Sequence, residues 1–146
     1  MIHIDIITVG KLRDKTLLAL WHDYTKRLHW PLTLHEIEAK KPGEDEKKVL
    51  AKLDSHAFIF VMDERGKSIA SVPFAHKLED IAADDVNRIQ FVIGGADGLS
   101  EVIRKKADFL LSFGAQTWPH MLARIMLAEQ IYRAQQILAG HPYHRE

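Results

Sequence analysis

Residues 91–98 read Phe-Val-Ile-Gly-Gly-Ala-Asp-Gly, an apolar run that passes directly into a glycine-rich turn. The apolar run begins at Ile89, is too short for a helix, and is typical of a strand buried in a parallel sheet. Gly94 and Gly95 have no Cβ, so a ligand can approach the backbone closely there. A Gly-Gly pair after a strand is more often a simple tight turn. The stretch therefore predicts a buried parallel strand and leaves ligand binding at its carboxyl end open.

The rest of the chain alternates between strands and amphipathic helices. Apolar or alternating runs predict strands at residues 2–9, 32–37, 57–62, 89–93 and 109–111. Apolar residues at helical spacing predict helices at residues 14–28, 44–53, 71–83, 100–106 and 119–139. Ser71 is the expected N-cap of the third helix, and residues 63–67 are expected to form a loop. This alternation predicts an α/β fold with a mainly parallel sheet and flanking helices, in a single domain over residues 1–146.

The composition is that of an ordinary folded domain. A chain of 146 residues is within the size of one domain, and 47% apolar residues is typical of globular proteins. The absence of cysteine excludes disulfides and thiolate metal sites and fits a reducing compartment. No apolar stretch approaches the roughly 20 residues that span a bilayer, and Met1 to Asp5 do not resemble a signal peptide. We therefore expect a cytoplasmic protein without membrane contact.

The charges of the chain balance, with 20 Lys and Arg against 20 Asp and Glu. Proteins that bind a phosphate backbone usually carry a basic excess. Binding of RNA would therefore require positive charge that is local, or that two copies of the chain assemble together. The candidate cations are Arg104, Lys105, Lys106, Arg124, Arg133 and those of the C-terminal tail. Each of them, taken singly, is more often a solvated surface charge.

The last predicted helix has apolar residues around most of its circumference, among them Met121, Ile125, Ile131 and Leu138. A helix on the outside of a sheet is normally polar on one face. Burial on more than one side is most simply explained in so small a chain by a partner subunit. The sequence therefore predicts a homodimer with this helix at its interface.

Three predicted strands end in loops that could line one pocket, because ligands of open α/β sheets bind at the carboxyl ends of strands. These loops cover residues 62–67, 94–98 and 113–118. The glycines match neither the dinucleotide-binding fingerprint nor the P-loop. The carboxylates of Asp63, Glu64 and Asp97 are candidate acids or bases, although solvated loop charges are the more common case.

Further candidate groups lie on the last helix and in the tail. His120 and Arg124 are four residues apart and face the same way, so they form either a basic notch for a phosphate or carboxylate, or a surface pair. Glu129 and Arg133 have the spacing of a structural ion pair. His141, Tyr143 and His144 can bind ligands, although a frayed end is the default for a terminus. No metal-binding spacing and no nucleophile-elbow serine is present, so no metal is expected.

The ordered set of motifs is far more specific than its members. It runs through VGK at 9–11, DERGK at 63–67, FVIGGADGL at 91–99, LSF at 111–113, TWPH at 117–120, Arg124, EQIYRA at 129–134 and HPYH at 141–144. Over essentially its full length, the chain resembles the family of ribosomal RNA large-subunit methyltransferase H, which belongs to the SPOUT class.

That resemblance implies a fold, a reaction and an assembly. The fold would contain a C-terminal deep trefoil knot, and the protein would act as a homodimer. The reaction would transfer the methyl group of S-adenosylmethionine to N3 of a pseudouridine in helix 69 of 23S rRNA, on assembled ribosomes. Carried over by position, the cofactor would contact Met62, Gly94, Phe113, Gly114, Ala115, Gln116, Thr117 and Trp118.

The tail and the start of the last helix are the expected substrate contacts. We hypothesise that Tyr143, His144 and Arg145 cross to the partner's pocket as the catalytic groups, with His144 as the base that accepts the N3 proton. His120 and Arg124 are the second choice, as phosphate or nucleotide contacts. Rival hypotheses are a SPOUT methyltransferase of another RNA site, a non-enzymatic RNA- or ribosome-binding protein with the same fold, and a nucleotide-dependent oxidoreductase.

Overall fold

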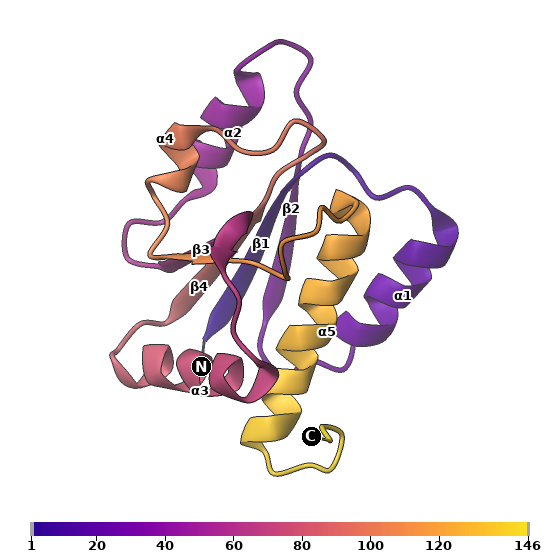
Figure 1. Ribbon diagram of the computed structural model, residues 1–146, viewed down its shortest axis with the longest axis vertical. Coiled ribbons are helices and arrows are strands. Elements are labelled where there is room, and N and C mark those ends of the chain that lie inside the picture. The colour runs from indigo at the N-terminus through magenta and orange to yellow at the C-terminus, as the bar shows by residue number, and fades with distance from the viewer. Residues whose placement is uncertain (1, 146) are drawn as a thin grey trace.

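The computed structural model describes residues 2–145 as one five-stranded sheet between two layers of helices (Figure 1). The strands are β1 (His3–Val9), β2 (Leu32–Ile37), β3 (Phe58–Lys67), β4 (Arg88–Ile93) and β5 (Phe109–Leu111). Their order across the sheet is β2-β1-β4-β3-β5, and all neighbouring pairs are parallel. The predicted α/β fold with a parallel sheet is confirmed.

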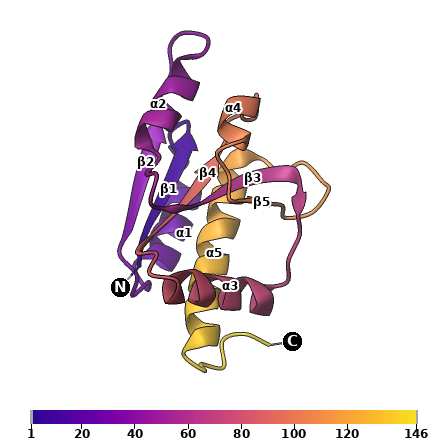
Figure 2. The same cartoon turned by 90° about the vertical axis from the view of Figure 1, so that its left-hand side faces the viewer.

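The five helices cover both faces of the sheet, as the view in Figure 2 shows. They are α1 (Lys15–Thr25), α2 (Glu44–Lys52), α3 (Ser71–Ala83), α4 (Glu101–Arg104) and α5 (His120–Leu138). Helices α1, α3 and α5 share one core with the sheet, and α2 and α4 share the other. None of the helices within residues 2–145 is long and apolar enough to cross a membrane.

The two cores follow from the alternation of side chains along each strand. Ile4 and Ile6 point to the core under α1, α3 and α5, whereas Ile7 points to the core under α2 and α4. The centre of the first core is a stacked pair of rings, Phe60 and Phe91, whose centroids are 4.7 Å apart. Both rings are fully buried, and each such side chain stabilises the fold by roughly 1.5–3 kcal/mol.

The third helix covers the predicted residues 71–83, but its N-cap lies one residue earlier than predicted. Its N-cap is Ala70, which has no side chain to cap the helix, and Ser71 is the first helical residue. The Ser71 hydroxyl instead donates a hydrogen bond to Oε1 of Gln130 on α5, at 2.8 Å. The expected capping by Ser71 was therefore wrong, because its hydroxyl serves the contact between two helices.

Strand β3 is longer than predicted and includes residues 63–67, which were expected to form a loop. Met62 and Lys67 both pair with Leu111 of β5, so the residues between them form a bulge. The bulge depends on Gly66, because a Cβ there would lie 2.5 Å from the backbone carbonyl oxygen of Leu110. A close approach of two backbones that requires glycine is not visible in a sequence read by periodicity.

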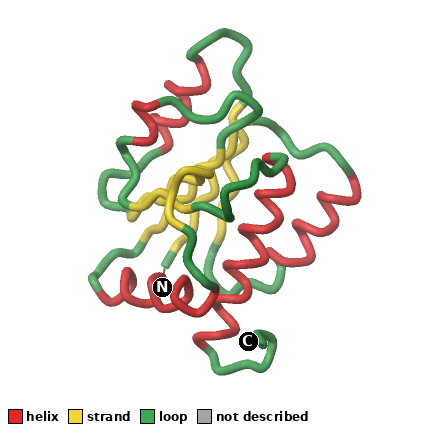
Figure 3. Tube along the Cα trace, in the orientation of Figure 1, coloured by secondary structure: helices red, strands yellow, loops and turns green. Residues whose placement is uncertain are grey.

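Helix α5 lies between α1 and α3 and packs on the sheet. Figure 3 shows the three helices in red, with α5 in the middle. Buried residues such as Ile125, Leu127, Ile131 and Ala134 therefore find neighbours within the chain. For most of the helix, packing within the chain explains the apolar circumference, which is therefore not by itself evidence of a partner subunit. The homodimer itself stays a prediction.

The bulge in β3 provides a test of the fold. Gly66→Ala is expected to lower the free energy of unfolding by about 3 kcal/mol, the upper end for overpacking, because the new Cβ meets backbone. Gly43→Ala is the control. Gly43 has a φ of +79° with no atom within 4 Å of a Cβ, so only the left-handed conformation costs energy, about 1 kcal/mol. Urea denaturation compares the two variants, and an equal loss in both would contradict the steric argument.

Candidate functional site

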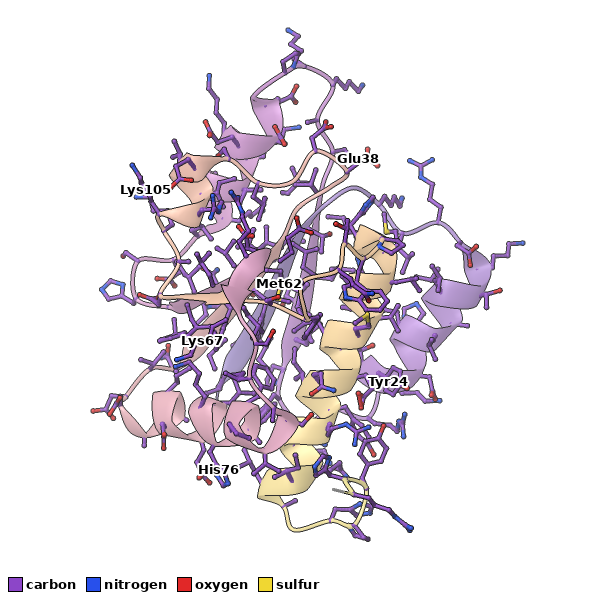
Figure 4. All side chains as sticks on the ribbon, viewed as in Figure 1. Tyr24, Glu38, Met62, Lys67, His76 and Lys105 are labelled. Atoms are coloured by element: carbon purple, nitrogen blue, oxygen red, sulfur yellow. The ribbon has the colours of Figure 1, made fainter. Side chains whose placement is uncertain are left out.

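The bulge of β3 and the segments that follow β4 and β5 meet in one cavity of about 840 Å³. The cavity lies at the carboxyl ends of these strands, beside the first turn of α5. Met62 lies at the centre of this region in Figure 4. Of the residues singled out for the cofactor, the structure brings together Met62, Gly94, Phe113, Gly114, Gln116, Thr117 and Trp118. Ala115 is exposed and lies outside the lining.

The turn after β4 forms one wall of the cavity and is closed by backbone contacts. The N–H of Gly98 donates to the carbonyl oxygen of Gly95 at 3.0 Å. A Cβ on Gly94 would lie 2.9 Å from the carbonyl carbon of Gly98 and from Cγ of Leu99. Gly98 itself has a φ of +73°, a conformation that favours glycine. The glycines are therefore required for the turn to fold back along the cavity.

The bulge of β3, the strand next to β4, forms another part of the lining and carries two carboxylates. Asp63 accepts a hydrogen bond from the N–H of Arg65 at 2.8 Å and forms an ion pair with Arg104 of α4. Burial of Asp63 opposes its ionisation, but the hydrogen bonds from Arg65 and the charge of Arg104 outweigh that effect and lower the pKa of Asp63. A carboxylate with such partners is a structural anion and not a proton acceptor near neutral pH.

The segment after β5 crosses the bulge and completes the cavity. The Thr117 hydroxyl donates to Oε2 of Glu64 at 2.7 Å, and Nε1 of Trp118 donates to the carbonyl oxygen of Phe113 at 3.3 Å. Ser112 is buried, and its hydroxyl accepts a hydrogen bond from the N–H of Gly114. The deep C-terminal knot implied by the resemblance stays a prediction.

Three backbone donors in this segment belong to residues that line the cavity. Within residues 2–145, the N–H groups of Gln116, Thr117 and Trp118 have no acceptor in the chain. The Trp118 side chain is 42% exposed although it lines the cavity. An exposed aromatic side chain beside free backbone donors suits a flat, hydrogen-bonding ligand.

His120 and Arg124 do not form the surface notch considered from the sequence. His120 lines the cavity, but the Arg124 side chain is only 1% exposed. Its guanidinium donates to Glu36 Oε2 at 2.7 Å, Thr8 Oγ1 at 2.9 Å and the carbonyl oxygen of Gly10 at 3.1 Å. Burial and these partners correct the expected phosphate contact of Arg124, because its donors are directed into the protein.

Glu36, the carboxylate partner of Arg124, accepts a second hydrogen bond and has a lowered pKa. Oε2 of Glu36 also accepts a hydrogen bond from the N–H of Leu12 at 2.7 Å. Burial of Glu36 opposes its ionisation, but the Leu12 hydrogen bond and the Arg124 guanidinium outweigh that effect and lower the pKa of Glu36. Arg124 and Glu36 are therefore a charged pair that ties the start of α5 to the ends of β1 and β2.

The C-terminal tail lies at the other end of α5 (Figure 1). The ring of Tyr143 packs edge-on against Tyr132, with 4.9 Å between centroids, and Nδ1 of His144 lies 3.0 Å from Nη1 of Arg133. Arg145 is exposed. Since α5 has 19 residues and rises 1.5 Å per residue, about 28 Å separates the tail from the cavity of the same chain.

A second cavity, of about 530 Å³, lies between α1, the start of α3 and α5. Its lining is mainly apolar and includes Leu20, Tyr24, Ile69, Phe74, Ile125 and Met126. Leu20 is 39% exposed, and Leu122, one turn before Met126 on α5, is 40% exposed. This face combines a hollow with exposed apolar side chains, which is typical of a protein contact surface.

Neither cavity carries a metal-binding arrangement in the part of the chain that the structure describes. Residues 2–145 contain no group of three or more His, Cys, Asp or Glu side chains that could hold an ion.

The fold and the site define a class of protein, a parallel α/β domain with a ligand cavity closed by a segment after the last strand. The model of the Predicted SPOUT methyltransferase family matches residues 2–144. The chain belongs to this SPOUT methyltransferase family.

Relatives and solved structures agree with this assignment. Ribosomal RNA large subunit methyltransferase H of Rhodospirillum centenum is 52% identical, over 96% of this chain and 97% of its own length. A probable methylase family protein from Haemophilus influenzae superposes with a TM-score of 0.61 at 11% identity, over 99% of this chain and 71% of its own. The SpoU methyltransferase AviRb from Streptomyces viridochromogenes, solved with AdoMet, has a TM-score of 0.51 at 15% identity, over 92% of this chain. This chain spans 58% of AviRb. At such low identities, both superpositions show the fold alone.

Sequence reasoning missed the residues that hold the site together. Glu36, Thr8 and Gly10 bind Arg124 from positions 88 to 116 residues away, and no local pattern links them. Glu64 and Thr117 were both noted, but their hydrogen bond across 53 residues was not. Gly10, Glu64, Thr117 and Arg124 belong to the ordered set of motifs, but Thr8 and Glu36 lie outside it, so no sequence signal pointed to their contacts with Arg124.

The buried pair gives a test with a defined pH dependence. Arg124→Met leaves the Glu36 carboxylate without its partner, so the free energy of unfolding is expected to fall by about 3–5 kcal/mol at about pH 7. The stabilisation that comes from the lowered pKa of Glu36 is complete above its ordinary value of 4.5, and is lost as the pH falls through the folded value. The gap between wild type and variant should therefore narrow in acid.

Urea denaturation across this pH range measures the gap. Arg13→Met is the control, because Arg13 pairs with Glu38 on the surface, where both side chains are more than half exposed. Its expected cost is below about 1 kcal/mol at every pH. A gap for Arg124→Met that stays constant into acid would contradict the role given to Glu36.

Proposed function

We propose that this protein transfers a methyl group from S-adenosylmethionine to N3 of a pseudouridine in helix 69 of 23S rRNA, on assembled ribosomes. The observation that carries the proposal is the convergence of three strand-end segments in one cavity, in a chain of the SPOUT methyltransferase family. The name of the Rhodospirillum centenum relative supports a large-subunit rRNA substrate, and AdoMet bound to AviRb supports the methyl donor. A ribosomal substrate implies action in the cytoplasm.

The cavity fits S-adenosylmethionine in size and in chemistry. A volume of about 840 Å³ is in the range of small-molecule sites. Met62, Leu99 and Phe113 offer apolar contact for the adenine and ribose, and the free N–H groups of the segment after β5 offer donors. The charge of Asp63 is compensated by Arg104, but the carboxylates of Glu64 and Asp97 also line the cavity, and their negative charge favours the positive sulfonium and ammonium groups.

The reaction needs alignment and the loss of one proton. When bound, S-adenosylmethionine supplies a methyl group whose carbon–sulfur bond breaks toward sulfur as N3 forms the new carbon–nitrogen bond and releases its proton. The walls of the cavity hold the donor in one place, and such positioning supplies much of the rate of a displacement reaction. His120, at the start of α5, lines the same cavity and remains the proposed nucleotide contact.

The tail serves this reaction only if a second copy of the chain brings it. Tyr143, His144 and Arg145 belong to the proposed catalytic set, but α5 separates them from the cavity of their own chain by about 28 Å. The proposal is therefore a homodimer in which each tail reaches the cavity of the partner. The apolar face around the second cavity, with Leu20 and Leu122 exposed, is the proposed contact surface.

The direct test of the proposed function is methyl transfer from labelled S-adenosylmethionine to ribosomes, free large subunits and naked rRNA. Incorporation should be highest on whole ribosomes, and mapping should place the new methyl group on N3 of a helix 69 pseudouridine. Methylation of a different base would favour a SPOUT enzyme of another site. Absence of S-adenosylmethionine binding in calorimetry would favour a non-enzymatic binding protein.

Mixed dimers test the shared site. Gly94→Val should close the cavity, since even a Cβ at Gly94 meets Gly98 and Leu99, and removal of residues 141–146 takes away the tail. Each variant alone should be inactive on ribosomes. Co-expression of the two should restore about a quarter of wild-type activity, because about half of the dimers are mixed and each has one intact site of two.

Two controls make the result decisive. Near-ultraviolet circular dichroism checks that both variants are folded, and the tail truncation should still bind S-adenosylmethionine. Light scattering that shows a monomer at micromolar concentration, or co-expression without recovery of activity, would overturn the shared site.

A further inference from the structure

The hydrogen bond between Arg133 and His144 fixes the form of the histidine ring. Nη1 of Arg133 lies 3.0 Å from Nδ1 of His144. A guanidinium only donates hydrogen bonds, so Nδ1 has to be the acceptor. A neutral imidazole with an accepting Nδ1 carries its proton on Nε2. His144 therefore presents an N–H donor at Nε2, and its one acceptor nitrogen is already in use.

Arg133 is itself held in place by neighbours on α5 and in the tail. Its Nε donates to Oε1 of Glu129 at 2.7 Å, in the ion pair expected from the spacing of the two residues. Its guanidinium carbon lies 4.8 Å from the centre of the Tyr143 ring. The Tyr143 hydroxyl lies 3.4 Å from the same Glu129 oxygen. The contacts with Glu129 and Tyr143 restrict the orientation of the Arg133 guanidinium, which in turn orients His144.

We propose that Arg133 is a positioning residue that holds His144 in the Nε2–H tautomer, so that His144 donates a hydrogen bond to the substrate base. The role on substrate rests on the proposed function, in which the tail reaches the partner's cavity. The carbonyl oxygens that flank N3 of a pseudouridine are acceptors, and negative charge develops on them as N3 loses its proton. A fixed N–H donor aimed at such an oxygen stabilises the transition state.

This inference replaces the role of general base that the sequence suggested for His144. A base needs a free lone pair within reach of the proton that it accepts. The lone pair on Nδ1 is occupied by Arg133, and Nε2 has none while it carries a proton. The N3 proton then passes to water. The Nε2–H group of His144 stabilises the negative charge that this leaves on the substrate nucleobase.

The tautomer can be measured without any substrate. Long-range proton–nitrogen spectra of the full chain distinguish the two neutral forms of a histidine ring, and His144→Gln identifies the signals of His144. We expect the Nε2–H form in the wild type and a mixture of both forms in Arg133→Met. Arg27→Met is the matched control, because Arg27 lies over the neighbouring Tyr132 ring and has no hydrogen bond to His144. A wild-type mixture, or no change in Arg133→Met, would overturn the inference.

Methyl transfer to ribosomes separates a donor from a base. The amide N–H of glutamine can stand in for the Nε2–H donor, but it cannot accept a proton. A donor role predicts that His144→Gln stays within about tenfold of the wild-type kcat and that His144→Ala loses about a hundredfold or more. Equal loss in both variants would show that His144 is a base. If the wild type itself transfers no methyl group, the proposed function fails, while the tautomer measurement still stands.

Discussion

The buried guanidinium of Arg124 is the contact on which the arrangement of the cavity depends. It joins the first turns of α5 to Thr8, Gly10 and Glu36, at the carboxyl ends of β1 and β2. Because α5 starts where the segment after β5 ends, fixing its first turns also fixes residues 113–118 against the bulge of β3. A buried charge is costly unless it is paired, and here the partners of Nη1 and Nη2 come from the ends of β1 and β2, while Nε has no partner within residues 2–145.

The layers of the fold could be predicted from the sequence, because burial of one face gives each helix or strand a regular spacing of apolar residues. The apolar run before Gly94 and the helical spacing in α5 are local patterns of that kind. The cavity could be outlined too, since parallel strands end at one edge. The Gly66 bulge and the burial of Arg124 could not, because each depends on a partner far along the chain. The tail was assigned from a resemblance, and the Arg133 contact then changed the chemistry assigned to His144.

Ion pairs within the chain occupy several of the cations that could bind RNA, in a chain whose net charge is already zero. Arg88, Arg104, Arg124 and Arg133 are all engaged by carboxylates of the same chain, so these arginines hold the fold together. Of the cations considered for RNA, Lys105, Lys106 and, in the tail, His141 and Arg145 remain exposed. So few charges give little affinity for a phosphate backbone as such. Under the proposed function, recognition therefore has to come from the shape of a folded ribosomal site.

The length of α5 decides how such a small domain can build a complete site. Its first turns border the cavity and its last turns hold the tail, so one chain carries both halves of the proposed site at opposite ends of a rigid element. No change of rotamer brings the two together. In a two-fold dimer with antiparallel α5 helices, however, the start of one helix lies beside the end of the other. The rigid helix that separates the cavity from the tail within one chain would then hold the cavity of one chain beside the tail of the other. Arg133 would orient His144 of that tail.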